Sequence, residues 1–393
     1  MLSLMRRVFA LMFIVGGGRW ANAQIVDMNC MLSFDDRSPQ LDQPWMHPEL
    51  DCLKLAVADP VGREMSFAAL TFADDDTLYS ARPETGEIFH IVDSDGDGIT
   101  DAPQVILENL DFPRALAWHS DILFIAERDQ ISAWDGISLQ PIITDIDVRG
   151  GFGFGALEVV DDRLYVAVGA PCDACEYDLE TRGIIFSTTL TGEDYQLVAQ
   201  GLRAPLAMQI VGDQLYVVDS APLDASALIT EPRFLDEINR IDLNQQSPVN
   251  FGYPTCMGQS IVRYNGDCSA YTAPYISLPA GSLPMGLAYT TSDVFPNLQN
   301  HFIVTLAGMP NSFDLRGYSV VSIDPQNPAQ IETIIPYNFS SNQDYSPQDL
   351  SYRDSSFFPR RPFDLAVDSL GRVYIAVTGG QVLAIYPAYD RVQ

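Results

Sequence analysis

One order of hydrophobic and polar positions repeats six times along the chain. Each copy has a short apolar strand, then a polar turn rich in Asp and Gly, then a second strand of the type Leu-Tyr-Val-Ala, and a third strand usually follows. The copies occupy residues 67–81, 113–127, 154–168, 204–218, 284–306 and 362–377. Repeats of short strands in a fixed order are typical of a β-propeller, in which each repeat forms one blade. The sequence therefore predicts an all-β fold, a six-bladed β-propeller, with its functional loops at one end of a central channel.

A ring of blades is one structural unit, because no blade can bury its faces alone. We therefore expect residues 64–393 to form a single propeller domain. Residues 24–63 form an N-terminal segment that either caps the ring or supplies a strand that closes it. Wider spacing between the last copies predicts inserts at about 221–283 and 325–360, and long inserts on a regular scaffold usually serve function or bind partners.

Residues 1–23 have the pattern of a signal peptide. Arg6 and Arg7 precede an apolar stretch over 8–15, and Ala21-Asn22-Ala23 forms a small-residue cleavage site. The apolar stretch is too short to span a membrane. We expect an exported protein, periplasmic or extracellular, whose mature chain begins at Gln24; a retained anchor is the alternative.

Composition narrows the classes of partner. The chain has 393 residues, 47% of them hydrophobic, which is ample for a large core. Its formal net charge is -30 at pH 7. Such an acidic surface repels nucleic acid and anionic membranes, so neither is an expected partner.

The six cysteines fall in pairs that are close in the sequence. An even count in an exported chain predicts disulfides, although six cysteines allow 15 pairings. A redox or zinc role for the C-x-x-C at Cys172 and Cys175 is disfavoured, because neither a thioredoxin-like setting nor further zinc ligands accompany it. Proximity favours three local disulfides, between Cys30 and Cys52, Cys172 and Cys175, and Cys256 and Cys268.

An acidic loop follows the third strand of the first copy. Carboxylates stand at positions 1, 3, 5 and 9 of this loop, and a glycine at position 6 permits a sharp turn. Position 12 is Gln104 rather than the bidentate Glu of an EF-hand, and no flanking helices are expected. Clustered carboxylates repel one another without a cation, which favours a structural calcium ion over a solvated acidic loop. The expected ligands are Asp93, Asp95, Asp97 and Asp101.

Several stretches together resemble one known family. These are DSDGDGITD, LDFPRALAW, VGAPCDAC, GLRAP, DEIN, NFGYPTC, LPMGLAY, RGYSVV and RRPFDLAV, between about Phe67 and Tyr386. In their order and blade positions they resemble the soluble glucose and sorbosone dehydrogenase propellers, which use pyrroloquinoline quinone. The resemblance implies a quinone at the channel mouth, calcium against its carboxylates, and a histidine base that takes a hydroxyl proton while hydride passes to the quinone.

The resemblance carries over to some site residues and not to others. Arg203 and Arg361 match family arginines, and Asn311 falls at a family asparagine, so the resemblance implies that these three bind the cofactor. The family's next asparagine is Ala204 here. Its histidines correspond to the stretch 152–154, which reads Phe-Gly-Phe, and to about Gly281. The four histidines of this chain lie elsewhere and are interpreted as structural: His47, His90, His119 and His301.

Three functions therefore remain open. The first is oxidation of a sugar or polyol with another base, for which Glu158, Asp161 and Asp162 are candidates. The second is a catalytically silent propeller that binds a carbohydrate or a protein partner through its long inserts. The third is a lactonase-like enzyme, which needs inward carboxylates around an axial calcium; Asp236 and Glu237 are candidates.

Overall fold

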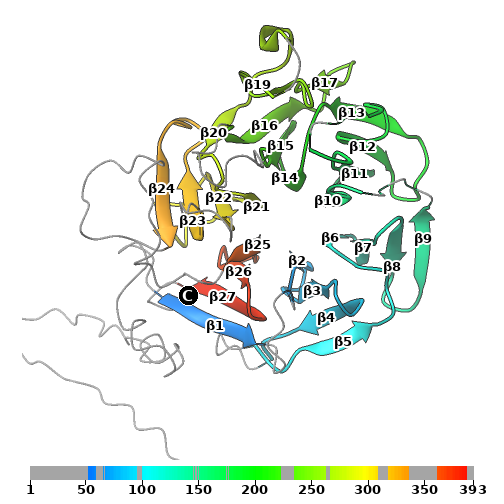
Figure 1. Ribbon diagram of the computed structural model, residues 1–393. Coiled ribbons are helices and arrows are strands. Elements are labelled where there is room, and N and C mark those ends of the chain that lie inside the picture. Colours follow the sequence, from blue (N-terminus) through cyan, green and yellow to red (C-terminus); the bar gives the residue numbers. More distant parts are fainter. Residues whose placement is uncertain are drawn as a thin grey trace, which may run out of the picture.

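The chain folds as a six-bladed β-propeller around a central channel, as predicted (Figure 1). The structure is a computed structural model. Among the residues that the structure describes, the regular elements are strands, apart from a 3₁₀ turn at Cys268–Ala270. It describes residues 52–58, 65, 67–94, 100–144, 146, 148, 150–173, 175, 177–222, 234–262, 266–308, 317–335 and 361–386.

Each blade has four antiparallel strands, with one further short strand added to blade three, and the first strand of each blade lies next to the channel. Blade one contains β2 (Ala69–Phe72), β3 (Leu78–Arg82), β4 (Glu87–Ile91) and β5 (Gln104–Leu107). Blade two contains β6 (Ala115–His119), β7 (Ile122–Ala126), β8 (Ile131–Trp134) and β9 (Leu139–Ile143). Blade three contains β10 (Phe154–Val160), β11 (Arg163–Val168), β12 (Ile184–Thr189) and β13 (Gln196–Gln200).

The remaining blades follow the same plan. Blade four contains β14 (Pro205–Val211), β15 (Gln214–Asp219), β16 (Asp236–Asp242) and β20 (Ile276–Leu278). Blade five contains β21 (Pro284–Thr290), β22 (His301–Leu306), β23 (Ser319–Ile323) and β24 (Ile331–Ile335). Blade six contains β25 (Pro362–Val367), β26 (Val373–Val377), β27 (Gln381–Tyr386) and β1 (Cys52–Ala58).

The polar turns of the repeat form the hairpins between the first and second strands. These tight turns need residues with positive φ, and Asp161 (φ 50°) and Gly212 (φ 57°) supply them in blades three and four. The Asp- and Gly-rich spacing in the sequence is thus a direct consequence of turn geometry. These turns fix where the chain leaves each inner strand and returns as the second strand of the blade.

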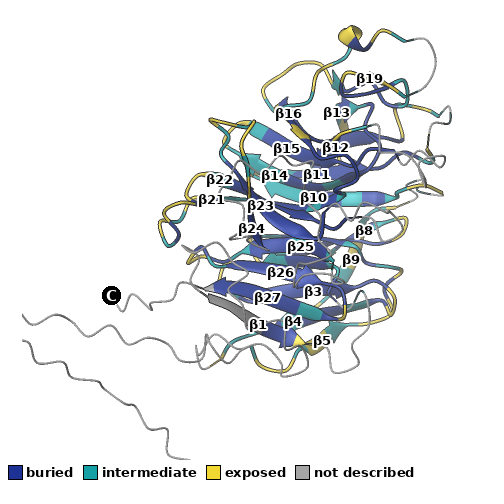
Figure 2. Cartoon of the chain, turned by 60° about the vertical axis from the view of Figure 1, so that its left-hand side comes forward, coloured by how far each residue is buried: buried dark blue, intermediate teal, exposed yellow. Residues whose placement is uncertain are grey.

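The hydrophobic core lies between adjacent blades rather than at the axis. One cluster joins Tyr216 and Ile238 of blade four to Phe302 and Val304 of blade five, all buried. Equivalent clusters lie between the other neighbouring blades. Figure 2 shows the buried residues along the strands and the exposed ones mainly on the loops at the margins. Every blade therefore depends on both neighbours, as expected for a closed ring.

The N-terminal segment closes the ring. β1 pairs antiparallel with β27, with Leu55 opposite Leu383, so the last blade takes its outer strand from the start of the described chain. Of the two roles that the sequence left open, the structure shows the closing strand. This pairing covers the exposed edge of β27.

The long segment of blade four differs from the expected insert. Residues 221–283 contain two strands of that blade, β16 and β20, so only the stretches around them are additional. In one of them β17 (Val249–Asn250) pairs parallel with β13 of blade three, and β18 (Cys256–Met257) pairs with β19 (Ser260–Ile261). Likewise β24 of blade five lies inside the predicted insert 325–360. The repeat pattern contained β16 as the third strand of its blade, but it did not give the fourth strands β20 and β24, which have only three and five residues.

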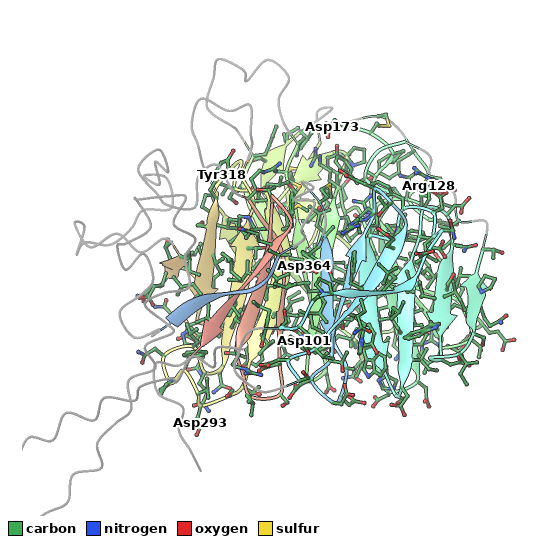
Figure 3. The ribbon with its side chains drawn as sticks, turned by 90° about the horizontal axis from the view of Figure 1, so that it is seen from below. Asp101, Arg128, Asp173, Asp293, Tyr318 and Asp364 are labelled. Atoms are coloured by element: carbon green, nitrogen blue, oxygen red, sulfur yellow. A yellow bond between two sulfur atoms is a disulfide. The ribbon has the colours of Figure 1, made fainter. Side chains whose placement is uncertain are left out.

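The channel has two ends, and each is named after a residue that lies there. We call the end at which the six inner strands begin the Arg203 end, and the opposite one the Asp101 end. In Figure 3 Arg128, Asp173 and Tyr318 lie at the Arg203 end, Asp101 and Asp293 at the other, and Asp364 between them.

Candidate functional site in the channel and at its mouth

The inner strands of all six blades line a cavity of about 540 Å³ along the channel. Each inner strand has one edge without a neighbouring strand, so its backbone N–H and C=O groups need other partners. Among the lining side chains are a guanidinium, two carboxyls and an amide, those of Arg114, Glu158, Asp364 and Gln209.

Three of these side chains accept hydrogen bonds from backbone N–H groups at the open edge of the inner strand in the next blade. The Ile210 N–H of blade four donates to Glu158 Oε1 of blade three at 3.3 Å. The Tyr289 N–H donates to Gln209 Oε1 at 3.1 Å. The Leu70 N–H donates to Asp364 Oδ2 at 2.8 Å. In three of the six inner strands, β10, β14 and β25, a polar residue therefore links its blade to the next one.

The two carboxyls of the channel wall, Glu158 and Asp364, have pKa values near 7. Burial raises the pKa of Glu158 to about 7, although the Ile210 N–H bond partly opposes it. Burial likewise raises the pKa of Asp364 to about 7 against two backbone N–H bonds. Both side chains are nevertheless partly accessible from the channel. A carboxyl with such a pKa can accept or donate a proton near pH 7.

Close glycine packing brings blades three and four together at the mouth. A Cβ at Gly155 of β10 would lie 1.6 Å from the Pro205 carbonyl oxygen of β14. Backbone bonds then fix the mouth loops: the Phe152 N–H donates to the Ala170 carbonyl at 3.1 Å, and the Ala170 N–H donates to the Arg203 carbonyl at 2.7 Å. Phe152 and Arg203 are thereby positioned side by side.

The predicted cofactor ligand Arg203 makes three side-chain contacts with protein groups. Its guanidinium carbon lies 4.3 Å from the ring centre of Phe152, a cation–π contact. Nε donates to Asp173 Oδ1 at 2.7 Å, and Nη1 donates to the Ser220 carbonyl at 2.8 Å. The residue is 4% exposed. We name this arrangement of Phe152, Arg203 and Asp173 the mouth stack.

The second matched arginine, Arg361, also binds backbone at the Arg203 end. It precedes β25, and its Nε and Nη2 donate to the carbonyls of Ala307 and Gly308 at 3.0 and 2.8 Å. These carbonyls belong to the loop after β22, so Arg361 joins blade six to blade five. The third matched residue, Asn311, lies outside the described residues.

Blade four has three buried acids, Asp219, Asp236 and Glu237, and the first two interact with Arg203. Asp219 accepts from the Arg203 and Ala204 N–H groups, with shortest distances of 3.0 and 2.6 Å. Asp236 accepts from the Ala221 and Leu283 N–H groups at 2.7 and 2.9 Å. Burial raises the pKa of Asp219 to about 6, and it also raises the pKa of Asp236. These two carboxyls brace the loops before the neighbouring inner strands.

Glu237 has the most perturbed environment of the three. Burial and the nearby Asp219 raise its pKa to about 8. It is 3% exposed, accepts from Asn239 Nδ2 at 3.2 Å, and its Oε1 would be 2.8 Å from a Cβ at Gly258. Neither Asp236 nor Glu237 lines the channel cavity, so neither is placed for the axial calcium that the lactonase-like hypothesis needs.

The other predicted site residues lie apart from the mouth. Asp161 is in the hairpin between β10 and β11, at the Asp101 end, and Asp162 follows it. His119 ends β6 and His301 begins β22, also at that end. His90 lies in β4 beside Tyr79, with ring centres 5.6 Å apart. None of the three described histidines lines the channel cavity.

The acidic loop lies at the Asp101 end, between β4 and β5. The Thr100 N–H and Oγ1 both donate to the Ala56 carbonyl of β1, at 3.1 and 2.6 Å. Asp95 and Asp97 lie outside the described residues. Within the described residues, no group of three or more His, Cys, Asp or Glu side chains is arranged to hold a metal.

Two disulfides lie at the Arg203 end, joining Cys172 to Cys175 and Cys256 to Cys268. The Tyr253 hydroxyl donates to the Cys172 carbonyl at 3.4 Å, which links the two disulfide loops. The third predicted pair involves Cys30, which lies outside the described residues. In the described part of the chain, no helix is long and apolar enough to cross a membrane.

Solved structures share this fold. The chain is similar to the PQQ domain of pyranose dehydrogenase from Coprinopsis cinerea in its holo form, with 12% identity and a TM-score of 0.65 over 84% of this chain and 94% of that one. It is similar to the calcium structure of a Trichoderma reesei carbohydrate-active enzyme of family AA12, with 13% identity and a TM-score of 0.65 over 85% and 95% of the chains. It is also similar to the soluble aldose sugar dehydrogenase from Escherichia coli in its apo form, with 16% identity and a TM-score of 0.58 over 85% and 99%.

The resemblance drawn from the sequence is thereby confirmed at the level of the fold. At these identities, the likeness shows the fold and not the chemistry. No protein-family model and no curated protein sequence matches the chain.

Sequence reasoning named Glu158 but missed Arg114, Gln209 and Asp364 as channel residues. A signal was present, because each of the last two is a polar residue inside an otherwise apolar strand: PLAMQIV and PFDLAV. Arg114 directly precedes the inner strand of its blade. Polar residues in or beside the first strand of a propeller repeat are the ones to examine.

Proposed function

We propose that this chain is an exported propeller with the sugar-dehydrogenase fold that binds a small carbohydrate or polyol at its channel mouth without quinone-dependent oxidation. The observation that carries the proposal is the mouth stack. Where the resemblance implies a histidine base, at residues 152–154, the chain reads Phe-Gly-Phe, and the Phe152 ring packs on the arginine that the resemblance implies for the cofactor.

The two described arginines that the resemblance assigns to the quinone are bonded to protein groups instead. Such a cofactor needs guanidinium donors that are open to its carboxylates. Arg203 already donates to Asp173 and a carbonyl, and Arg361 to two carbonyls. The buried Asp219, whose pKa burial raises only to about 6, adds negative charge nearby at neutral pH. We therefore assign no chemical step to a quinone.

The channel supports the carbohydrate half of the proposal. Its volume of about 540 Å³ is in the range of small-molecule pockets, roughly 300–1,000 Å³. Carboxyl, amide and guanidinium groups stand among apolar and aromatic side chains, a mixture that suits hydroxyls and C–H faces of a sugar. The known structures with this fold include enzymes named for sugars.

A ligand panel tests this proposal. The full protein is screened by thermal shift and calorimetry against neutral aldoses, polyols and sugar acids, with and without quinone and calcium. We expect saturable binding of at least one class and no dependence on the quinone. Absence of binding across the panel contradicts the proposal.

A second candidate function is oxidation with Glu158 as the base. Its pKa of about 7 and its place on the channel wall favour it. On this hypothesis, reconstitution with quinone and calcium gives dye reduction that Glu158→Gln abolishes. Activity that survives Glu158→Gln would exclude this role.

A further inference from the structure

The cavity contains one cation without an acidic partner. Arg114 lines the channel just before β6, and Nη1 donates to the Phe152 carbonyl at 2.9 Å. Nε and Nη2 make no hydrogen bond in the described part of the chain, and no carboxylate pairs with this guanidinium there. Neither nitrogen is among the buried side-chain atoms that lack a partner, so both remain accessible from the channel.

The backbone is shaped around this guanidinium. Gly153 has a φ of +60°, and a Cβ there would lie 3.2 Å from Arg114 Nη1. Nη1 is thereby fixed by blade three, which leaves the edge formed by Nε and Nη2 for a ligand. That edge is the planar fork that binds a carboxylate through two parallel hydrogen bonds.

The positive charge of Arg114 indicates which ligand group its Nε and Nη2 edge would bind. The desolvation of Arg114 by surrounding protein lowers its pKa, and a guanidinium nevertheless stays charged in proteins. A partly desolvated cation without a counter-charge is unfavourable, and a ligand carboxylate reduces that cost. The two carboxyl groups elsewhere on the channel wall, those of Glu158 and Asp364, accept hydrogen bonds from backbone N–H groups of the neighbouring blades.

We infer that the channel mouth selects acidic sugars, aldonic or uronic acids, by binding their carboxylate at Arg114. The inference rests on the proposed function, whose ligand class it narrows. The ring or chain hydroxyls then face the remaining polar wall, and Phe112, which also lines the cavity, offers an aromatic face.

Calorimetry with gluconate, glucose and sorbitol tests the inference on the wild type and three variants. Arg114→Gln removes the charge, Arg114→Lys keeps the charge without the fork, and Arg240→Gln is the control on an exposed arginine of blade four. We expect gluconate to bind more tightly than glucose or sorbitol. Arg114→Gln should weaken gluconate at least about tenfold, as expected for a charged hydrogen-bonded pair, Arg114→Lys should weaken it less, and Arg240→Gln should leave it unchanged.

The outcomes separate this inference from the proposed function. Binding of glucose or sorbitol as tight as gluconate, or gluconate binding that both Arg114 variants retain in full, overturns the inference and leaves the proposed function standing. No binding of any of the three probes overturns the inference, and no binding across the wider ligand panel contradicts the proposed function as well. Should Arg114→Gln not fold, Arg114→Lys and the loss of gluconate affinity at high salt decide, because screening weakens an ionic contact but not a neutral one.

Discussion

Replacing Glu237 by Gln should stabilise the protein, and increasingly so as pH rises. Glu237 is 3% exposed, and burial with the nearby Asp219 raises its pKa to about 8. The folded protein therefore keeps this proton at neutral pH, whereas the unfolded chain releases it above about 4.5. Because the unfolded state binds fewer protons between these two values, stability falls as pH rises through this window.

The size of the effect follows from the shift. One pKa unit corresponds to about 1.4 kcal/mol. Relative to a neutral side chain of the same shape, Glu237 lowers the free energy of unfolding by about 1 kcal/mol at pH 5 and by about 3 kcal/mol at pH 7. These values are upper limits, because rearrangement around a buried charge reduces the penalty. Gln keeps the size and the hydrogen-bonding capacity of the carboxylic acid, so the change removes mainly the titration.

Chemical denaturation at pH 5, 7 and 8.5 measures the effect. We expect the gain of Glu237→Gln over the wild type to grow between pH 5 and pH 8 and then level off. Glu108→Gln, on an exposed residue, is the matched control and should show no such growth. A variant that is less stable than the wild type, or whose gain does not change with pH, would refute the reasoning and point to a charged, paired Glu237.

Three further outcomes are expected. Gly155→Ala should destabilise the protein by about 3 kcal/mol in denaturation, because its Cβ would lie 1.6 Å from the Pro205 carbonyl oxygen; an unchanged midpoint contradicts the close packing of blades three and four. Chelation should lower the melting temperature if calcium binds the loop 93–101, because Thr100 of that loop holds the closing strand through Ala56, and Asp95→Ala should remove the difference; identical melting curves with and without chelator count against the ion. Peptide mapping of the secreted, non-reduced protein should find the disulfide between Cys256 and Cys268, and free thiols at both would contradict export to an oxidising compartment.

The blades were predictable because each repeat is defined by residues that are close together in the sequence. Apolar strands joined by Asp- and Gly-rich turns leave a strong period, and Asp161 and Gly212 adopt the positive φ that such turns require. The outer strands were harder to predict. β20 has three residues, and the closing strand β1 pairs with β27 at the other end of the sequence, so no local pattern reveals it.

The candidate site was predictable only in part. Arg203 was found by its motif, but its engagement depends on Asp173 and Phe152, which come from other loops of blade three. Glu158 gave a local signal as a carboxyl inside an apolar strand, yet its bond to Ile210 depends on how blades three and four meet. The free fork of Arg114 follows from what surrounds it in space, which a sequence does not record.

Dye reduction after reconstitution tests the central claim most directly. The purified protein is incubated with excess pyrroloquinoline quinone and calcium, and electron transfer to a dye is followed with glucose, other aldoses, polyols and gluconate. Because no histidine stands at residues 152–154 and Arg203 is held by Asp173, the account predicts no rate above that of quinone and substrate alone. Saturable turnover of any substrate, lost when the quinone is omitted, would contradict it.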